Sequence, residues 1–207
     1  MSDYLELVSS VSISQKNRLI SCDKSLQLIG TGRSAFVFKV KASNIAIKVF
    51  FPAFEYIARE EAGIYKLLHG IHYFPSVHEA GPNYIVMDYV EGNTLFQCLT
   101  KGKIITSKHI EEIDYALSLV ASRGLNPSDI HLRNIFITVS DEIRLIDVAR
   151  YRQNKECRQW SDLKKAHQQF YRRRFFFKKI PAPFLNIVAF LYKKGLMPFY
   201  RSTIHLR

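Results

Sequence analysis

Short apolar runs separated by turn residues dominate the first 90 positions of the chain. Residues 45–50 (IAIKVF) and 84–90 (YIVMDYV) are rich in β-branched and aromatic side chains, a composition typical of strands, and a further strand is expected over 73–80. The stretch 54–69 predicts a helix. The pattern therefore predicts a strand-rich N-terminal region that contains one helix.

Helical periodicity returns after residue 106. Ser107 is a suitable N-cap, and Glu111 and Glu112 in the expected first turn would suit the helix dipole. We expect this helix to end at Gly124. The apolar positions that recur at the spacing of one buried helix face are Ile110, Ile113, Leu117 and Val120.

Two β-branched runs further along the chain bring oxygen-bearing side chains together. The runs 135–139 (IFITV) and 143–146 (IRLI) flank a short polar turn and predict a hairpin. Because a hairpin brings its ends together, Asp147 would lie beside Asn134 and Asp129. Hard cations such as Mg²⁺ take such oxygen ligands and share them with substrate phosphates. Asp and Asn are also common turn residues, so this pattern needs a second signal.

The second signal is a glycine-rich segment upstream. Gly30-Thr31-Gly32-Arg33-Ser34-Ala35-Phe36-Val37 precedes the strand 45–50, which carries Lys48. Glycine lets backbone N–H groups approach phosphate oxygens closely, and a lysine adds a positive charge. A plain hairpin would need similar glycines, and a strand lysine is often a solvated edge residue. The two features gain weight only because they occur together with the acidic pattern downstream.

Taken in order, these segments resemble the protein-kinase-like superfamily, in the form of a small bacterial member. The segment 59–68 resembles the helix whose glutamate pairs with the strand lysine, with Glu61 in register and Glu60 as the alternative. Residues 84–92 resemble the strand and hinge that hold the adenine, with Met87 as the gatekeeper. The matching motifs are Gly30-x-Gly32-x-x-Ala35-x-Val37 for G-x-G-x-x-G-x-V, Ala46-Ile47-Lys48 for A-x-K, Asp129 to Asn134 for D-x-x-x-x-N, and Asp147-Val148-Ala149 for D-F-G.

This resemblance implies a fold, a reaction and a set of site residues. The implied fold is α+β and bilobal, a single kinase-like domain with a small β-rich N-lobe over about residues 24–87 and a reduced helical C-lobe over 88–207. The implied reaction uses ATP and Mg²⁺ to phosphorylate a hydroxyl of an unknown acceptor, as Ser/Thr protein kinases do. The implied roles are catalytic for Asp129, Lys48 and Glu61, magnesium-binding for Asn134 and Asp147, and nucleotide-binding for Gly30, Gly32, Ala35, Val37, Ala46, Lys48, Met87, Asp88 and Val90.

Several departures from the family pattern keep two alternatives open. Pro127-Ser128 replaces the H-R of H-R-D, no A-P-E follows, and Trp160-Ser161-Asp162-Leu163 resembles an anchoring helix that comes soon after Asp147. His131 stands where protein kinases commonly have lysine, which resembles small-molecule kinases such as aminoglycoside and lipopolysaccharide-core kinases. The first alternative is therefore a small-molecule kinase. The second is a nucleotide-binding pseudokinase or basic scaffold, which Ala35 and Ala149 favour.

Composition indicates one domain in a reducing compartment. The chain has 207 residues, of which 47% are hydrophobic, enough for a sizeable core. Its three cysteines are scattered and cannot all pair, and no apolar signal leads the sequence, so we expect a cytoplasmic protein. Residues 180–192 are apolar but too short to span a bilayer, which needs about 20 such residues. His69 and His72 have no third metal ligand near them in sequence.

Positive charge is concentrated at the C-terminal end. Residues 1–149 hold 15 Lys+Arg and 16 Asp+Glu, whereas residues 150–207 hold 15 and 2. The segment 171–179 (YRRRFFFKK) interleaves aromatic and basic residues, which suits an anionic membrane, nucleic acid or an acidic partner. The simpler expectation is that its aromatic rings pack in the helical lobe while its charges face solvent.

Overall fold

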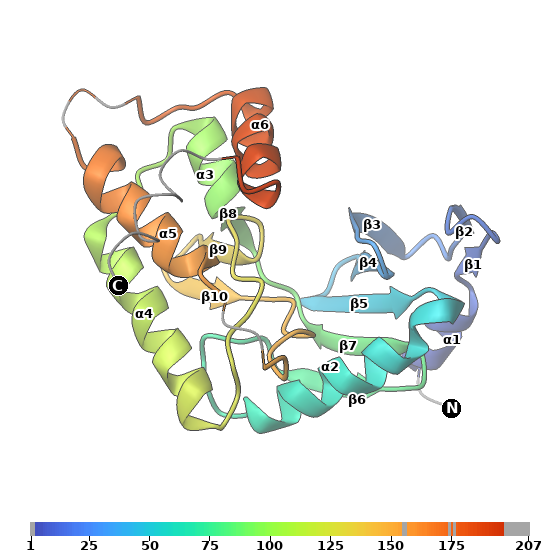
Figure 1. Cartoon of the computed structure of the whole chain (residues 1–207). Coiled ribbons are helices and arrows are strands. Elements are labelled where there is room, and N and C mark those ends of the chain that lie inside the picture. The colour runs from blue at the N-terminus through green and yellow to red at the C-terminus, as the bar shows by residue number, and fades with distance from the viewer. Residues whose placement is uncertain (1–2, 155–156, 174, 176, 197–207) are drawn as a thin grey trace.

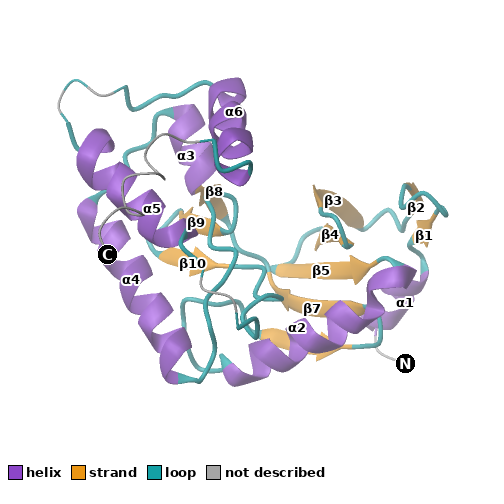
Figure 2. Ribbon diagram, in the orientation of Figure 1, coloured by secondary structure: helices purple, strands orange, loops and turns teal. Residues whose placement is uncertain are grey.

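A five-stranded antiparallel sheet occupies the N-terminal part of the chain, and helices dominate the C-terminal part (Figure 1, Figure 2). The computed structural model describes residues 3–154, 157–173, 175 and 177–196. The N-terminal elements are α1 (Asp3–Ser9), β1 (Ser12–Ile13), β2 (Leu19–Ser21), β3 (Leu26–Thr31), β4 (Ala35–Val40), β5 (Ile45–Phe50), a 3₁₀ turn (Pro52–Phe54), α2 (Glu55–Leu67), β6 (Val77–Ala80) and β7 (Tyr84–Asp88). The remaining elements are β8 (Gly92–Thr94), α3 (Leu95–Lys101), α4 (Ser107–Ser122), β9 (Ile135–Thr138), β10 (Ile143–Leu145), α5 (Gln159–Ala166), a π-helical turn (His167–Tyr171) and α6 (Ala182–Lys193).

The strand order of the large sheet is β3-β4-β5-β7-β6, and β5 is the central strand. Side chains alternate between the two faces of a strand. On β5, Ala46 and Phe50 therefore join the core beneath α2, while Ile47 and Val49 join a second core on the opposite face. Lys48 lies between Ala46 and Phe50 in this alternation, so its side chain is on the α2 face.

The second face of the sheet is covered by the first residues of the chain. Val8 of α1 is buried in one cluster with Phe36 and Phe38 of β4. Phe36 also meets Phe51 edge to face, with ring centroids 4.9 Å apart. Burial of both faces holds the strand that carries Lys48 in a fixed position.

A small three-stranded sheet, β10-β9-β8, links the sheet-rich part to the helices. Gly92 of β8 pairs with Thr138 of β9. A Cβ at Gly92 would lie 2.4 Å from the Ile137 carbonyl oxygen, so only glycine permits this close pairing. The pairing connects the chain after β7 directly to the hairpin that precedes Asp147.

Most of the expected elements are confirmed. The hairpin predicted from 135–146 is the antiparallel pair β9 and β10, in which Ile143 faces Ile137. The helix expected over 54–69 is α2, preceded by the 3₁₀ turn. The apolar positions expected to form a buried stripe on α4 are all in the main core, namely Ile110, Ile113, Leu117 and Val120.

The strand expected over 73–80 is wrong in its first half, because strand pairing begins only at Val77. Ile71 and Phe74 donate backbone hydrogen bonds to residues three positions earlier, which closes successive turns. Pro75 then has no N–H to give to a neighbouring strand. Instead, the carbonyl oxygen of Tyr73 accepts a hydrogen bond from Leu145 of β10, 2.8 Å away.

The start and end of α4 also differ from the prediction. Thr106, not Ser107, is the N-cap: its hydroxyl accepts from the His109 N–H, and the His109 ring accepts from the Thr106 N–H. The first turn contains no acidic residue, because Glu111 falls in the second turn. The helix ends at Ser122, and Gly124 follows with φ +72°, a left-handed conformation that glycine tolerates.

The three cysteines and the apolar segment 180–192 all lie within the described residues. Cys22, Cys98 and Cys157 are all free thiols. The apolar segment forms most of α6, which packs beside α3 (Figure 1). Among the described residues, no helix combines the length and the apolar character needed to cross a membrane.

Candidate functional site

Lys48 is the centre of a three-residue charge cluster between β5, α2 and the loop after β10. Its Nζ atom donates to both carboxylate oxygens of Glu61, at 2.9 and 2.7 Å, and to Oδ1 of Asp147 at 3.1 Å. The Glu61 side chain is 1% exposed, whereas the Asp147 side chain is 46% exposed. The cluster therefore has one closed end, at the helix, and one open end, at Asp147. The predicted register is confirmed for Glu61, and the alternative Glu60 does not take part.

The electrostatics of the cluster favour the charged forms of Lys48 and Asp147, whereas burial outweighs the Lys48 ammonium at Glu61 and raises the pKa of that carboxyl. Burial alone would lower the pKa of Lys48, but the carboxylates of Glu61 and Asp147 outweigh it and raise this pKa. Burial alone would raise the pKa of Asp147, but the Lys48 ammonium outweighs it and lowers this pKa, with a further contribution from His131. An ionised Asp147 is the form that could bind a cation.

The β9–β10 hairpin brings the other predicted site residues to Asp147. The Ile146 N–H donates to the carbonyl oxygen of Asn134 at 3.0 Å, which extends the hairpin pairing by one residue. Asp147 is therefore the first residue after the paired part of the hairpin. Asn134 is buried, and its Nδ2 donates to the backbone oxygen of Asp129 at 3.2 Å. The structure therefore brings Asp129, Asn134 and Asp147 to one place, as the hairpin argument predicted.

Asp129 and Asp147 both have a left-handed backbone, with φ of +60° and +61°. Such values are uncommon outside glycine, and Asp and Asn tolerate them better than other residues because their short side chains bond locally. Strained backbone of this kind clusters at functional sites, where the surrounding structure fixes it. Strained backbone therefore holds the carboxylates of Asp129 and Asp147 in the loops on either side of the hairpin.

The surroundings of the Asp129 carboxylate include a residue that the sequence did not reveal. Arg150 Nη1 lies 3.5 Å from Oδ2 of Asp129, and His131 Nε2 lies 3.9 Å from Oδ1. Burial lowers the pKa of His131, although Asp129 opposes the effect, which favours the neutral imidazole. Arg150 follows Asp147-Val148-Ala149 by one residue, and nothing in its local sequence distinguishes it from the other basic residues of the C-terminal region.

The glycine-rich segment forms the tight turn between β3 and β4. The Gly32 N–H donates to the Ala35 carbonyl oxygen at 2.9 Å, which closes the turn. Gly30 pairs with Val37 across the two strands, and Val37 in turn pairs with Lys48 across β4 and β5. The turn is therefore connected through one strand pairing to the strand that holds the lysine.

Ala46, Met87, Asp88 and Val90, which the sequence predicts to surround a nucleotide, differ in what their side chains contact. Ala46 and Met87 pair across β5 and β7, and both side chains are buried in the core on the α2 side. The Asp88 carboxylate is occupied elsewhere: it accepts from the Ser76 N–H at 2.9 Å and contacts His78 at 2.7 Å. At Asp88 only the backbone could contact an adenine. Val90 follows β7, and no described residue accepts a hydrogen bond from its N–H.

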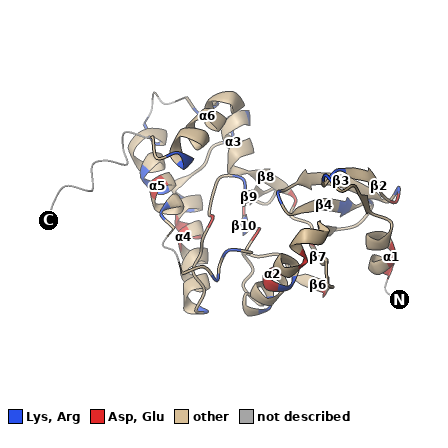
Figure 3. Cartoon of the chain, turned by 45° about the vertical axis from the view of Figure 1, so that its right-hand side comes forward, with Lys and Arg blue, Asp and Glu red and all other residues tan. Residues whose placement is uncertain are grey.

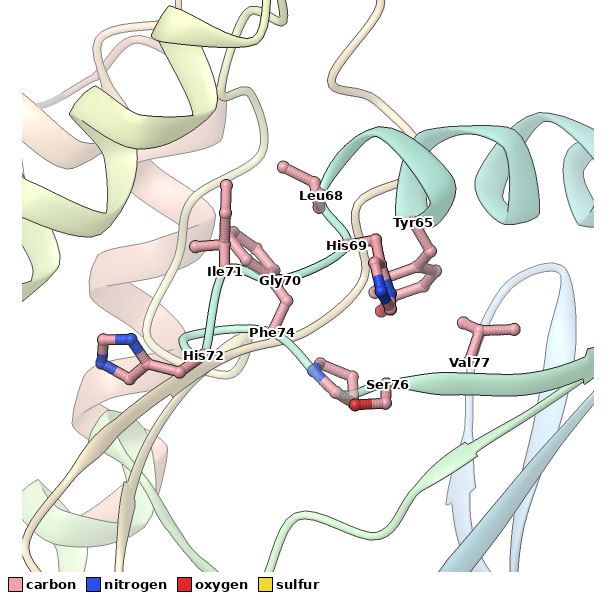
Figure 4. A pocket seen from close by; sticks show the side chains of 10 residues that line it. Tyr65, Leu68, His69, Gly70, Ile71, His72, Phe74, Ser76 and Val77 are labelled. Atoms are coloured by element: carbon pink, nitrogen blue, oxygen red, sulfur yellow. The ribbon is translucent and has the colours of Figure 1, made fainter.

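A separate pocket of about 130 Å³ lies between the end of α2 and the start of β6 (Figure 4). It contains His69 and is bordered by His72, the two histidines that are close in sequence. The His72 ring lies against the Tyr73 ring at a tilt of 38°, with centroids 3.9 Å apart, and points away from His69 in Figure 4. Among the described residues, no group of three or more His, Cys, Asp or Glu side chains could hold a metal ion. We therefore assign no role to this pocket.

Comparison with known proteins places the chain in a family. No family model matches it. A protein of Bacillus subtilis (strain 168), named "Putative serine/threonine-protein kinase YrzF", is 47% identical to it over 173 residues, which make up 83% of this chain and 80% of that protein. This chain belongs to the same family. The protein is thus kinase-like, in agreement with the resemblance seen in its motifs.

Proposed function

We propose that this protein is an ATP- and Mg²⁺-dependent phosphotransferase that moves the γ-phosphate to a hydroxyl group, as Ser/Thr protein kinases do. The observation that carries the proposal is the Lys48 ammonium bonded to both Glu61 and Asp147. In this proposal the sheet-rich part, about residues 24–87, is the N-lobe of a single bilobal domain, and residues 88–207 form a reduced C-lobe.

The described side chains fit a nucleotide and a magnesium ion. Lys48 would bind the α- and β-phosphates while Glu61 holds its amine in position. Asn134 Nδ2 is bonded to the protein, which leaves its Oδ1 for a cation, and Asp147 uses only Oδ1 on Lys48, which leaves Oδ2. Oxygen ligands of this kind are those that Mg²⁺ takes together with substrate phosphates. The ion would neutralise charge on the transferring phosphate.

Asp129 is assigned to the acceptor. Its carboxylate would orient the attacking hydroxyl or accept its proton. His131 and Arg150 flank this carboxylate within 4 Å, so they would limit how it can turn. The glycine-rich turn, Ala35 and Val37, together with Ala46, Met87 and the backbone of Asp88 and Val90, would surround the nucleotide.

A small-molecule acceptor is the second candidate, and one feature favours it. α5 begins at Gln159, soon after Asp147, so the connection between them has little room for a peptide-docking segment. The neutral His131, where protein kinases commonly have a lysine, agrees with this alternative. The nucleotide half of the site is the same for both candidates.

The proposal is tested by measuring label transfer from ATP with Asp129→Asn. Asparagine tolerates the left-handed backbone at this position, so the substitution removes the carboxylate charge without adding strain. Loss of a general base typically costs about 10²- to 10⁴-fold, and we expect transfer to lysate proteins or small molecules to fall within that range. Asp141→Asn is the matched control, since Asp141 also has a positive φ, of 64°, but lies in the β9–β10 turn.

Nucleotide binding separates catalysis from a scaffold role. Mg·ATP at about 100 times its dissociation constant should stabilise the fold by about 2.7 kcal/mol in thermal melts, with wild type and with Asp129→Asn alike. Asp147→Asn should lose this metal-dependent stabilisation. Stabilisation without any transfer would favour a pseudokinase. No stabilisation by ATP, ADP or GTP, with magnesium or manganese, would refute the nucleotide site itself.

A further inference from the structure

The C-terminal helix α6 presents an apolar face that nothing described in the chain covers. Phe184, Ile187 and Phe190 recur every three residues along one side of the helix, and their exposed fractions are 58%, 57% and 58%. The expectation that the aromatic rings of 171–179 would be packed is correct for Tyr171, which is 6% exposed, and wrong for Phe175 and Phe177, at 91% and 83%. Phe176 lies outside the described residues. Large apolar side chains grouped in this way mark binding surfaces.

The opposite side of α6 is held firmly, so the apolar face is fixed in its outward direction. Leu185 is buried in the main core, and the Tyr192 hydroxyl donates to Asp162 of α5 at 2.7 Å. Asn186 accepts from Arg133 at 2.9 Å. The N–H of Ile180 donates to Leu99 of α3 at 2.9 Å, which fixes the segment that leads into the helix.

Basic residues are frequent on α6 and in the segment that precedes it. The last 45 residues contain 11 Lys+Arg and no Asp or Glu. Figure 3 shows basic positions on α5, on α6 and along the loop that joins them. The described basic residues on α6, at its C-cap and between the π-helical turn and α6 are Arg172, Arg173, Lys178, Lys179, Lys193 and Lys194, and Arg174 lies outside the described residues. Among the described residues, none of these six has an acidic side chain as an ion-pair partner.

We propose that α6 and its flanking basic residues form a docking surface for an anionic lipid bilayer. An amphipathic helix with aromatic and aliphatic residues on one face and lysines beside them lies in the plane of a membrane interface. The 12 residues of α6 are too few to cross a bilayer, which needs about 20, but suffice to lie on one. Nucleic acid would satisfy the charges but offers no apolar phase to Phe184, Ile187 and Phe190. A second copy of the chain would bring two positively charged faces together.

This surface is connected to the candidate site, although the proposal does not depend on kinase activity. Arg133, which bonds Asn186, is one residue before Asn134 and stacks on Phe96 at 3.6 Å from the ring centroid. Lys193 adds to the lowering of the His131 pKa, which burial dominates. Docking of α6 would therefore hold the loop that contains Asp129 near the bilayer surface.

The test is co-sedimentation with vesicles of phosphatidylglycerol and phosphatidylcholine, compared with pure phosphatidylcholine. We expect binding to the anionic vesicles only, weakening as salt shortens the Debye length from roughly 10 Å at 0.1 M to 3 Å at 1 M. Lys193→Glu with Lys194→Glu should reduce affinity at least about 25-fold, because each basic residue near such a surface contributes about 1 kcal/mol, a factor of about five, and each new glutamate is repelled by the anionic lipid. Lys16→Glu with Lys66→Glu changes net charge equally, far from α6, and should have a much smaller effect.

The apolar half of the surface needs its own variant. Phe190→Ser should reduce binding about tenfold or more, given the free energy of burying a phenylalanine. Tyr56→Ser is the matched control: Tyr56 is 63% exposed but lies at the start of α2, away from α6 (Figure 1). If Phe190→Ser failed to fold, a Phe190→Trp variant would replace it, with quenching of its fluorescence by brominated lipid as the readout.

Three results would overturn the proposal. Equal binding by Phe190→Ser and Tyr56→Ser would exclude insertion of α6. Equally tight binding to an anionic DNA duplex, also insensitive to Phe190→Ser, would show a general polyanion surface. A concentration-dependent dimer in sedimentation that Phe190→Ser abolishes, without vesicle binding, would show that a second copy covers the face.

Discussion

The sheet-rich N-terminal part and the region of α5 and α6 differ in whether their apolar faces are covered and their charged groups paired. In the first, both faces of the sheet are covered, and the buried cations and anions are paired, as with Lys48 and Glu61. In the second, one face of α6 is uncovered, and basic residues greatly exceed acidic ones. In the N-terminal part, apolar faces and buried charges find their partners within the chain. In the region of α5 and α6, an apolar face and an excess of positive charge are available to a binding partner.

The difference shows that composition alone does not separate the two regions. Both contain clusters of phenylalanine, and a count of aromatic residues would predict a core in each. What separates them is the direction of the side chains relative to neighbouring elements. Substitutions in these regions test the difference, and the one with the largest expected effect compares a residue from each.

The largest contrast is between Phe38 and Phe184. Phe38 of β4 is fully buried in the cluster that includes Val8 of α1, and Phe38→Ala should lower the free energy of unfolding by about 4 kcal/mol, from lost burial and the cavity left behind. Phe184 is 58% exposed, and Phe184→Ala should change stability by less than about 0.5 kcal/mol. Urea denaturation measures both. A cost for Phe184→Ala close to that for Phe38→Ala would mean that the α6 face is covered in solution.

The next contrast lies within one helix turn of α2. Glu61→Ala should destabilise the protein by about 3 kcal/mol, because it leaves the Lys48 ammonium in a mostly buried site with only Asp147 as a partner. Glu60→Ala, one residue away and outside the cluster, should stay within about 0.5 kcal/mol of wild type. Denaturant midpoints distinguish them. Equal effects from the two variants would show that the pair contributes nothing to the fold of the sheet-rich part.

The smallest expected effect is the pH dependence at the open end of the cluster. The pKa of Asp147 is lowered in the folded state, so its ionised form contributes stability above its unfolded pKa of roughly 4, and this contribution is lost as pH falls through the lower folded value. Wild type should therefore exceed Asp147→Asn in stability near pH 6 and lose that advantage in acid. The effect is small because the side chain is 46% exposed and solvent screens its charge. A difference that persisted below the folded pKa would point to a role other than charge.

Local sequence patterns predicted the strands and the hairpin well because their side-chain periodicity is set by the backbone. β5 and β7 were recognisable as runs of β-branched and aromatic residues, and the β9–β10 hairpin from two such runs around a polar turn. The hairpin prediction also placed Asn134 next to Asp147, since pairing forces the two ends of a hairpin together. Local patterns failed where a cap or a proline decided the outcome, as at Thr106 and Pro75.

The sequence by itself determined the elements that carry the candidate site and the order of Lys48, Glu61, Asp129, Asn134 and Asp147 along the chain. Only the tertiary structure decided that Lys48 Nζ bonds Glu61 rather than Glu60, that the Asp88 carboxylate points to His78, and that Arg150 approaches Asp129. These contacts join residues far apart in sequence, and their geometry depends on how separate elements pack. The exposure of the α6 face is decided in the same way: periodicity gives a helix an apolar side, but only its neighbours determine whether that side is covered.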